Sequence, residues 1–139
     1  MRTDLPTGTV TFFFSDIEGS TRLAQRLGPA FRQVIDDHNA VVRAVVAATN
    51  VVEVRTVGDS FFLVFESAGE AVEAAIRVQQ SLEEHRWPQE AAVRVRIGLH
   101  TGEGALGGDD YVGLDVHRAA RISGAAHGFM IEHATTFNR

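Results

Sequence analysis

The sequence predicts an α+β fold in which helices cover one face of a largely antiparallel, ferredoxin-like sheet. One observation is that short runs rich in valine, isoleucine and phenylalanine alternate with segments whose apolar residues recur every three or four positions. Another is their order along the chain, which is strand, helix, helix, hairpin, helix, strand, helix, without an internal repeat or linker. Such an order suits one layer of strands packed against helices on one side.

The composition is typical of one globular domain. Of the 139 residues, 45% are hydrophobic and 22% are charged, which excludes the disordered and collagen-like classes. The net charge of -5 argues against a nucleic-acid-binding protein, because a basic face is needed to neutralise phosphates. The absence of cysteine excludes a disulfide framework and a thiolate metal site. No segment resembles a signal peptide or a membrane span, so we expect a cytoplasmic protein.

The N-terminal part is predicted to hold one strand and two helices. Residues 10–15 form a dense run of β-branched and aromatic side chains, as in a buried strand. Ser20 or Thr21 is expected to cap the helix that follows. Residues 30–49 place apolar side chains at the i, i+3, i+4 spacing of an amphipathic helix. His38 lies on its apolar face, where a partnered core histidine is commoner than a ligand.

The remaining elements begin with a hairpin. Residues 51–57 and 60–65 are β-rich runs separated by Gly58 and Asp59, the pattern of a tight turn with a residue at positive φ. Apolar residues then recur at helical spacing over residues 70–85. The last predicted elements are a strand over 93–100, a glycine-rich stretch over 102–113 and a short helix over 114–125.

Two aspartates stand where apolar strands end: Asp16 follows the first strand, and Asp59 lies in the hairpin turn. If those strands are neighbours, two carboxylates converge with nothing obvious to neutralise them, and divalent cations are the usual answer. The alternative is that both are ordinary turn residues. Gly19, Ser20 and Thr21 open a helix behind Asp16. Its free N–H groups and dipole can hold phosphate oxygens, although an ordinary capped helix start has the same pattern.

The sequence lacks a cysteine nucleophile, a Gly-x-Ser-x-Gly elbow and a P-loop. Four segments instead indicate a specific family. They are residues 10–21, 54–61, 96–102 and 113–121. In sequence and in order, these segments resemble the class III adenylate/guanylate cyclase catalytic domain of the bacterial type. The similarity covers residues 8–128, nearly the whole chain, and implies a nucleotide cyclase-like version of the predicted fold.

The resemblance implies a two-metal site. Asp16 and Asp59 are expected to hold two Mg²⁺ or Mn²⁺ ions, with the backbone carbonyl of Ile17 as a further ligand. The ribose 3′-hydroxyl then attacks the α-phosphate, pyrophosphate leaves, and a 3′,5′-cyclic nucleotide forms. In the family this site lies across a head-to-tail dimer, so the resemblance implies a homodimer in which each subunit supplies half of each site.

The second half of the site is implied by four other residues. Arg121 matches the family arginine that stabilises charge on the α-phosphate. His117 falls where the family usually has an asparagine that orients the ribose. Arg55 takes the place of the lysine that reads the purine in adenylate cyclases, and Asp110 that of its partner. A donor beside an acceptor favours ATP over GTP.

Residues 129–139 depart from the family pattern, which normally continues to a final hairpin bearing a phosphate-binding lysine. All 13 basic residues of this chain are arginine, so that lysine is missing. We expect the domain to span residues 8–128 and the remainder to be a divergent or truncated C-terminal tail. Loss of the final strands would leave an open sheet edge and reduce stability.

Two functions follow as hypotheses. The first is an adenylate cyclase-like enzyme that converts ATP to 3′,5′-cyclic AMP and pyrophosphate at a homodimer interface. The alternative is a catalytically silent cyclase-homology module that acts in nucleotide binding, dimerisation or regulation. A weaker third hypothesis is a truncated remnant without a stable fold.

Overall fold

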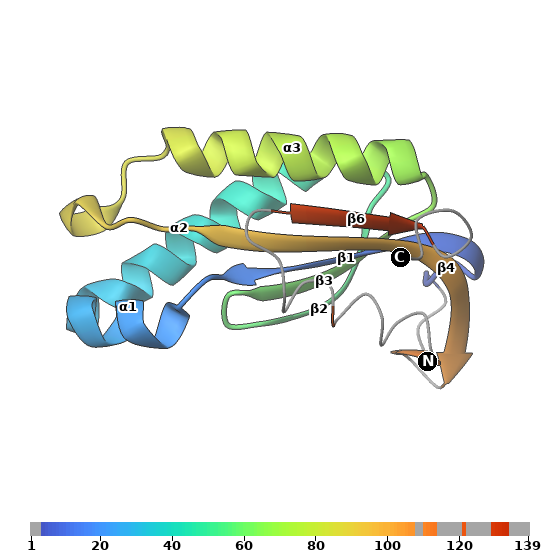
Figure 1. The fold of residues 1–139 in the computed structure, drawn as a ribbon, viewed down its shortest axis with the longest axis horizontal. Coiled ribbons are helices and arrows are strands. Elements are labelled where there is room, and N and C mark those ends of the chain that lie inside the picture. Colours follow the sequence, from blue (N-terminus) through green and yellow to red (C-terminus); the bar gives the residue numbers. More distant parts are fainter. Residues whose placement is uncertain (1–3, 108–109, 114–120, 122–128, 134–139) are drawn as a thin grey trace.

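The computed structural model describes residues 4–107, 110–113, 121 and 129–133. The predicted α+β fold is confirmed: a six-stranded sheet carries its helices on one face (Figure 1). In chain order the elements are β1 (Gly8–Ile17), α1 (Ser20–Leu27), the short 3₁₀ turn η1 (Gly28–Ala30), α2 (Phe31–Val46), β2 (Val52–Val57), β3 (Ser60–Phe65), α3 (Ala68–Glu84), η2 (Pro88–Glu90), β4 (Val95–Gly107), β5 (Asp110–Val112) and β6 (Phe129–His133).

The sheet is built around β1. Its order is β2-β3-β1-β4-β5, with β6 also paired to β4. β1 is antiparallel to both neighbours, so that Phe13 lies between Leu63 of β3 and Leu99 of β4. Only β6 pairs in parallel among the described strands. The central position of β1 explains its dense apolar sequence, because both of its edges are paired and most of its side chains from Val10 to Ile17 are buried.

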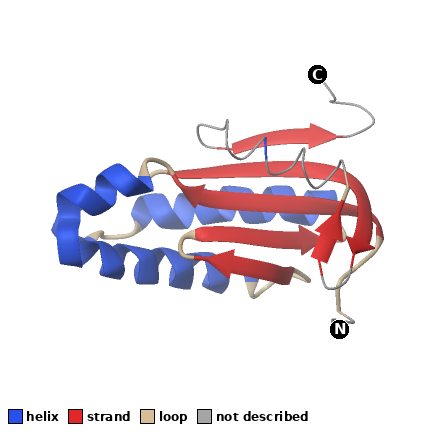
Figure 2. Cartoon of the chain, turned by 90° about the horizontal axis from the view of Figure 1, so that it is seen from below, coloured by secondary structure: helices blue, strands red, loops and turns tan. Residues whose placement is uncertain are grey.

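The two faces of the sheet bury separate apolar clusters, because successive side chains of a strand point to opposite sides. The face toward α1, α2 and α3 holds the larger cluster, in which Phe13 and Ile17 of β1 contact buried residues of the helices. Figure 2 shows these helices together on one side of the strands. Each fully buried phenylalanine or isoleucine contributes about 1.5–3 kcal/mol, so this cluster is the main source of stability.

The opposite face carries a smaller cluster that includes Phe12, Phe62 and Tyr111. The Tyr111 ring meets Phe12 edge-on at 5.2 Å between centroids, and its hydroxyl donates a hydrogen bond to the Pro6 carbonyl at 2.5 Å. Phe14 is only partly buried here and stacks on Phe62 at 4.2 Å. The β4–β5 hairpin and the N-terminal segment therefore cover one end of this face.

Local differences from the sequence-based prediction appear at helix starts. α1 begins after Gly19, which adopts the left-handed conformation with φ of 64°, so the predicted cap at Ser20 or Thr21 is wrong. The chain turns sharply from β1 into α1 there, and glycine takes positive φ at no steric cost. α3 begins at Ala68, two residues before the prediction, because Ser67 accepts a hydrogen bond from the Glu70 N–H and caps the helix.

The glycine-rich stretch is largely strand. β4 extends to Gly107, seven residues beyond the predicted end, and β5 follows within the same stretch. A Cβ atom at Gly104 would lie 3.0 Å from the Tyr111 ring and 3.1 Å from a Val10 methyl group. Glycine is therefore present for close packing rather than for a loop.

The last predicted helix, over residues 114–125, lies outside the described residues except for Arg121, which is helical. Residues 129–133, in the segment expected to be a tail, form β6 and pair with β4 from Ile97 to Thr101. No helix in the described part of the chain has the length and apolar character needed to cross a membrane.

Candidate active site

Asp59 lies beside the end of β1. Gly58 has φ of 60°, as expected for the tight turn between β2 and β3. The Asp59 carboxylate accepts a hydrogen bond from the Ile17 N–H, with 2.6 Å between Oδ2 and N. Because Ile17 directly follows Asp16, this contact places the Asp59 carboxylate next to the end of β1 that carries Asp16. The expectation that the two strands are neighbours is confirmed by the pairing of β1 with β3.

Asp16 is held by an arginine that the sequence analysis did not select. Arg96 faces Asp16 across the β1–β4 pair and binds its carboxylate through two contacts, Nε to Oδ1 at 2.8 Å and a terminal nitrogen to Oδ2 at 2.9 Å. About a quarter of each side chain is exposed, 26% for Arg96 and 24% for Asp16. The expectation that nothing neutralises the carboxylates is therefore wrong.

Three carboxylates act electrostatically on Arg96. Its pKa is raised first by the hydrogen bond with Asp16, and the charges of Asp16, Glu18 and Asp59 add to this effect, while burial opposes it. Of these carboxylates, Asp16 contacts the guanidinium directly, and Glu18 and Asp59 act at longer range. Neighbouring carboxylates are the groups that attract a divalent cation.

The oxygen atoms at this edge are suited to a hard cation that also binds water or substrate oxygens. Within the described residues, no group of three or more histidine, cysteine, aspartate or glutamate side chains can hold a metal ion. Asp16 and Asp59 would supply two carboxylates, and the backbone carbonyl of Ile17 is a further candidate. Mg²⁺ is usually bound by one or two carboxylates together with water and substrate phosphates, so this small oxygen set is suitable.

The start of α1 lies directly behind this edge. Gly19 turns the chain out of β1, Ser20 is half-buried and Thr21 is exposed. The first backbone N–H groups of an α-helix have no partner within the helix, and they carry the positive end of its dipole. The three residues predicted to bind phosphate are thus placed at the same edge as Asp16.

The predicted purine-reading residues contact one another. The Arg55 guanidinium on β2 donates a hydrogen bond to the Asp110 carboxylate on β5, and both side chains are 47% exposed. The same guanidinium lies over the Phe62 ring, 4.8 Å from its centroid. This pair therefore lies on the face of the sheet opposite the helices, with its charges half in solvent.

The remaining predicted residues are described only in part. Arg121 is helical and exposed. His117 lies outside the described residues.

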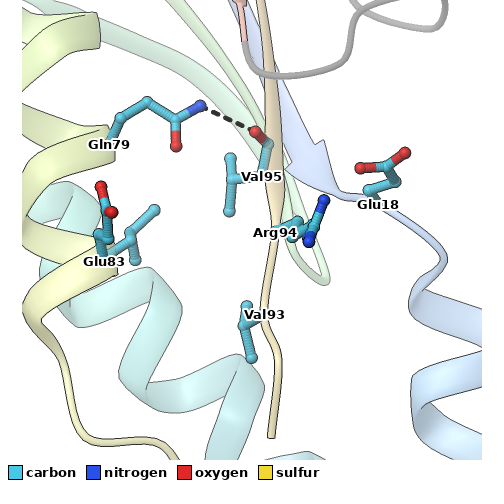
Figure 3. A pocket seen from close by; sticks show the side chains of 7 residues that line it. Glu18, Gln79, Glu83, Val93, Arg94 and Val95 are labelled. Carbon is cyan, nitrogen blue, oxygen red and sulfur yellow. Dashed lines mark hydrogen bonds between the residues drawn. The ribbon is translucent and has the colours of Figure 1, made fainter.

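A hollow of about 450 Å³ lies next to the candidate site rather than at it. Figure 3 shows Gln79 and Glu83 reaching from α3 toward one side of the β4 strand, with Glu18 on the other side. Gln79 donates a hydrogen bond to the Val95 carbonyl at 2.8 Å, which ties α3 to the start of β4. Asp16 and Asp59 do not line this hollow.

Comparison with known proteins identifies relatives along almost the whole chain. A family model described as the adenylate and guanylate cyclase catalytic domain matches residues 4–136. An adenylate cyclase of Lachancea kluyveri is 32% identical over 157 aligned residues, covering 95% of this chain and 8% of that protein. An uncharacterized protein of Mycobacterium tuberculosis is 39% identical over 126 residues, covering 88% of this chain and 41% of that protein.

Solved structures of similar fold lead to the same family. Adenylate cyclases from Trypanosoma brucei in their monomeric state have a TM-score of 0.85 and 27% identity, covering 94% of this chain and 75% of that chain. The guanylyl cyclase domain of the RhoGC fusion protein from Blastocladiella emersonii, at 22% identity, shares the fold with a TM-score of 0.81, covering 91% and 81%. The chain belongs to the adenylate and guanylate cyclase catalytic domain family.

Proposed function

We propose that this chain is an adenylate cyclase-like catalytic domain that converts ATP to 3′,5′-cyclic AMP and pyrophosphate at a homodimer interface. The observation that carries the proposal is the hydrogen bond from Ile17 to Asp59, which gathers two carboxylates at one edge of the sheet. In the reaction, a bond forms between the ribose 3′-oxygen and the α-phosphorus. The bond from that phosphorus to pyrophosphate breaks, and the hydroxyl proton is released.

Asp16, Asp59 and the Ile17 carbonyl would hold two Mg²⁺ or Mn²⁺ ions. When bound, such ions supply Lewis-acid activation of the 3′-hydroxyl and neutralise charge on the triphosphate. Arg96 binds both oxygens of Asp16, but each carboxylate oxygen has a second lone pair, so Asp16 can also bind an ion. An ion at Asp16 competes with the Arg96 guanidinium, which is then suited to a phosphate oxygen.

The phosphates would be held at the start of α1. The backbone N–H groups around Gly19, Ser20 and Thr21 are donors without helical partners, and the helix dipole favours an anion there. In this arrangement a second subunit contributes Arg121, whose guanidinium stabilises charge on the α-phosphate, and His117, which orients the ribose.

Arg55 and Asp110 would read the purine. Asp110 accepts from the adenine amino group and Arg55 donates to the ring nitrogen N1. The two side chains are half exposed and pair with each other. Binding of the adenine base therefore has to separate only a solvent-screened ion pair, which costs little free energy. Val57, next to the turn, exposes 70% of its surface, and a second subunit is a suitable partner to cover it.

Turnover of ATP and GTP with Mn²⁺ or Mg²⁺ tests this function directly, by the amount of cyclic nucleotide formed. We expect product from ATP with the wild type, none from Asp59→Asn, and unchanged turnover from Asp36→Asn. Asp36 is the matched control, because its carboxylate is exposed on α2 and contacts Arg32 one helical turn earlier. Absence of product from a dimer of the wild type would contradict the proposal.

The composite nature of the site has its own test. Asp59→Asn and Arg121→Gln, each inactive alone, should restore about a quarter of wild-type turnover when mixed, because half of the dimers then contain one intact site of two. A mixture that stays inactive although heterodimers form would mean that each subunit works alone or not at all.

A catalytically silent nucleotide-binding module is the second candidate. The observation that favours it is that the Asp16 carboxylate already has a complete bidentate partner in Arg96. It predicts that ATP with Mn²⁺ raises the melting temperature while no cyclic product forms.

A further inference from the structure

His38 is a buried histidine whose hydrogen bonding is only half satisfied. It lies on α2 with no exposed surface, and its ring centroid is 5.9 Å from that of Phe61, two residues after Asp59. Nδ1 is 2.7 Å from the side-chain oxygen of Asn39. Nε2 is buried without a hydrogen-bond partner in the part of the chain that the structure describes. The predicted partnered core histidine is therefore partnered on one nitrogen.

Asn39 links this histidine to the turn that carries Asp59. Its side-chain nitrogen donates a hydrogen bond to the Gly58 carbonyl at 2.9 Å. A carbonyl only accepts, so the NH₂ group must face Gly58 and the amide oxygen must face His38. It follows that Nδ1 of His38 carries the proton and donates to Asn39. The direction of both hydrogen bonds is thus determined by the Gly58 carbonyl.

The Gly58 carbonyl belongs to the peptide unit that joins Gly58 to Asp59. Asn39 therefore holds the backbone immediately before Asp59 from the side of α2. The Asp59 carboxylate is held independently from the side of β1, by the Ile17 N–H. With two anchors from different elements, the turn has little freedom to rotate the carboxylate away from Asp16.

The electrostatic surroundings place His38 near both predicted ligands. Burial lowers its pKa, whereas the hydrogen bond with Asn39 and the charges of Asp59 and Asp16 act in the opposite direction. A packing role alone does not account for a histidine here, because an apolar ring of similar size would fill the same space without a buried, unpaired nitrogen.

We propose that His38 and Asn39 are positioning residues for Asp59, acting through the chain from His38 to Asn39 to the Gly58 carbonyl. The effect of this positioning on catalysis rests on the proposed function, because the orientation of Asp59 affects turnover only if Asp59 is a metal ligand. Hydrogen bonds to the groups around metal ligands commonly influence metal affinity 10- to 100-fold. An effect of about that size is expected here.

Three variants of the whole chain test the hydrogen bonds that link His38, Asn39 and Gly58. Asn39→Ala removes both contacts, and His38→Phe keeps the ring but removes both nitrogens. His38→Asn keeps a donor at the position of Nδ1 and serves as the conservative variant. Asp36→Asn, on the same helix and outside the chain of hydrogen bonds, is the matched control.

The first measurement is binding of Mn²⁺ alone, followed by the magnetic resonance signal of free Mn²⁺. We expect affinity to fall about tenfold or more in Asn39→Ala and His38→Phe, and to be largely retained in His38→Asn and Asp36→Asn. The melting temperature of His38→Phe should change little, because removal of the unpaired Nε2 offsets the lost hydrogen bond to Asn39. Unchanged affinity in Asn39→Ala, or a loss that follows the melting temperature across all variants, would overturn the inference.

A second measurement needs no metal. Amide hydrogen exchange at Ile17 and Asp59 should be about tenfold faster in Asn39→Ala than in Asp36→Asn, because the turn has lost one of its two anchors. Equal exchange would contradict the positioning role. Asp59→Asn separates this result from the proposed function. If Asp59→Asn binds Mn²⁺ as tightly as the wild type, the metal assignment fails, whereas the exchange rates still decide the inference.

Discussion

The two ion pairs of the candidate site differ in how the fold holds them. Asp16 and Arg96 face each other on adjacent strands, make two contacts and are about a quarter exposed. Arg55 and Asp110 come from strands that are not neighbours, and both are 47% exposed. The first pair is set by backbone register, and the second depends on two solvated side chains. We therefore call Asp16 and Arg96 the preset half of the proposed site, and Arg55 and Asp110 its adaptable half.

The largest effect is expected from removing a carboxylate of the preset half. Asp16→Asn should lower turnover roughly a hundredfold or more, because a metal ligand contributes several kcal/mol of transition-state stabilisation. The measurement is kcat with ATP and Mn²⁺, beside the Asp36→Asn control. If Asp16→Asn retained more than about a tenth of wild-type kcat, the preset half would not be the metal half.

The arginine of the preset half is expected to have opposite effects on metal and on substrate. Arg96→Gln removes the competitor for Asp16, so Mn²⁺ alone should bind more tightly, while turnover of ATP falls about tenfold or more because a phosphate partner is lost. The same change should lower the free energy of unfolding by about 1–3 kcal/mol, since a partly buried charged hydrogen bond is broken.

Chemical denaturation, Mn²⁺ binding and kcat measured on Arg96→Gln separate these effects. Tighter Mn²⁺ binding without any loss of turnover would show that Arg96 only masks Asp16. Weaker Mn²⁺ binding would instead contradict the competition between the guanidinium and the ion.

The adaptable half should affect specificity more than stability. Arg55→Glu places an acceptor where a donor stands, so the ratio of kcat/KM for ATP to that for GTP should fall about tenfold. Stability should change by less than about 1 kcal/mol, because a half-exposed ion pair is screened by solvent. Competition assays with both nucleotides give the ratio, and Arg32→Glu is the exposed control on α2. An unchanged ratio would remove Arg55 from purine recognition.

The smallest expected effect is a pH dependence of stability from His38, which lies beneath the preset half. Burial holds the pKa of His38 below its ordinary value of 6.5, against the opposing effects of Asn39, Asp59 and Asp16. As the pH falls below 6.5, the unfolded chain binds a proton that the folded protein does not. Stability therefore decreases toward acidic pH, by at most about 1.4 kcal/mol per pH unit.

Chemical denaturation of the wild type and of His38→Phe between about pH 7.5 and about pH 5, the range in which histidine titrates, measures how the free energy of unfolding changes with pH. The phenylalanine variant should lose the histidine contribution and show a flatter profile. Identical profiles would mean that His38 titrates alike in both states.

Part of this site was predictable because its signals are local. The dense apolar run of β1 and the helical spacing along α2 each involve residues close together in the sequence, so both elements were predicted. Asp16 and Asp59 were selected because each follows an apolar run. The cap at Gly19 was missed, because left-handed glycine and a side-chain cap leave similar patterns at a helix start.

The sequence by itself therefore determined the elements from β1 to the start of β4, their order and the two carboxylates, but not β5 and β6. Tertiary structure decided which groups surround them. Arg96 lies 80 residues from Asp16 along the chain, and only the register of β1 with β4 brings them together. Asn39 likewise reaches Gly58 only because α2 packs against the sheet. Register and packing depend on contacts summed over the whole core, which no local period records.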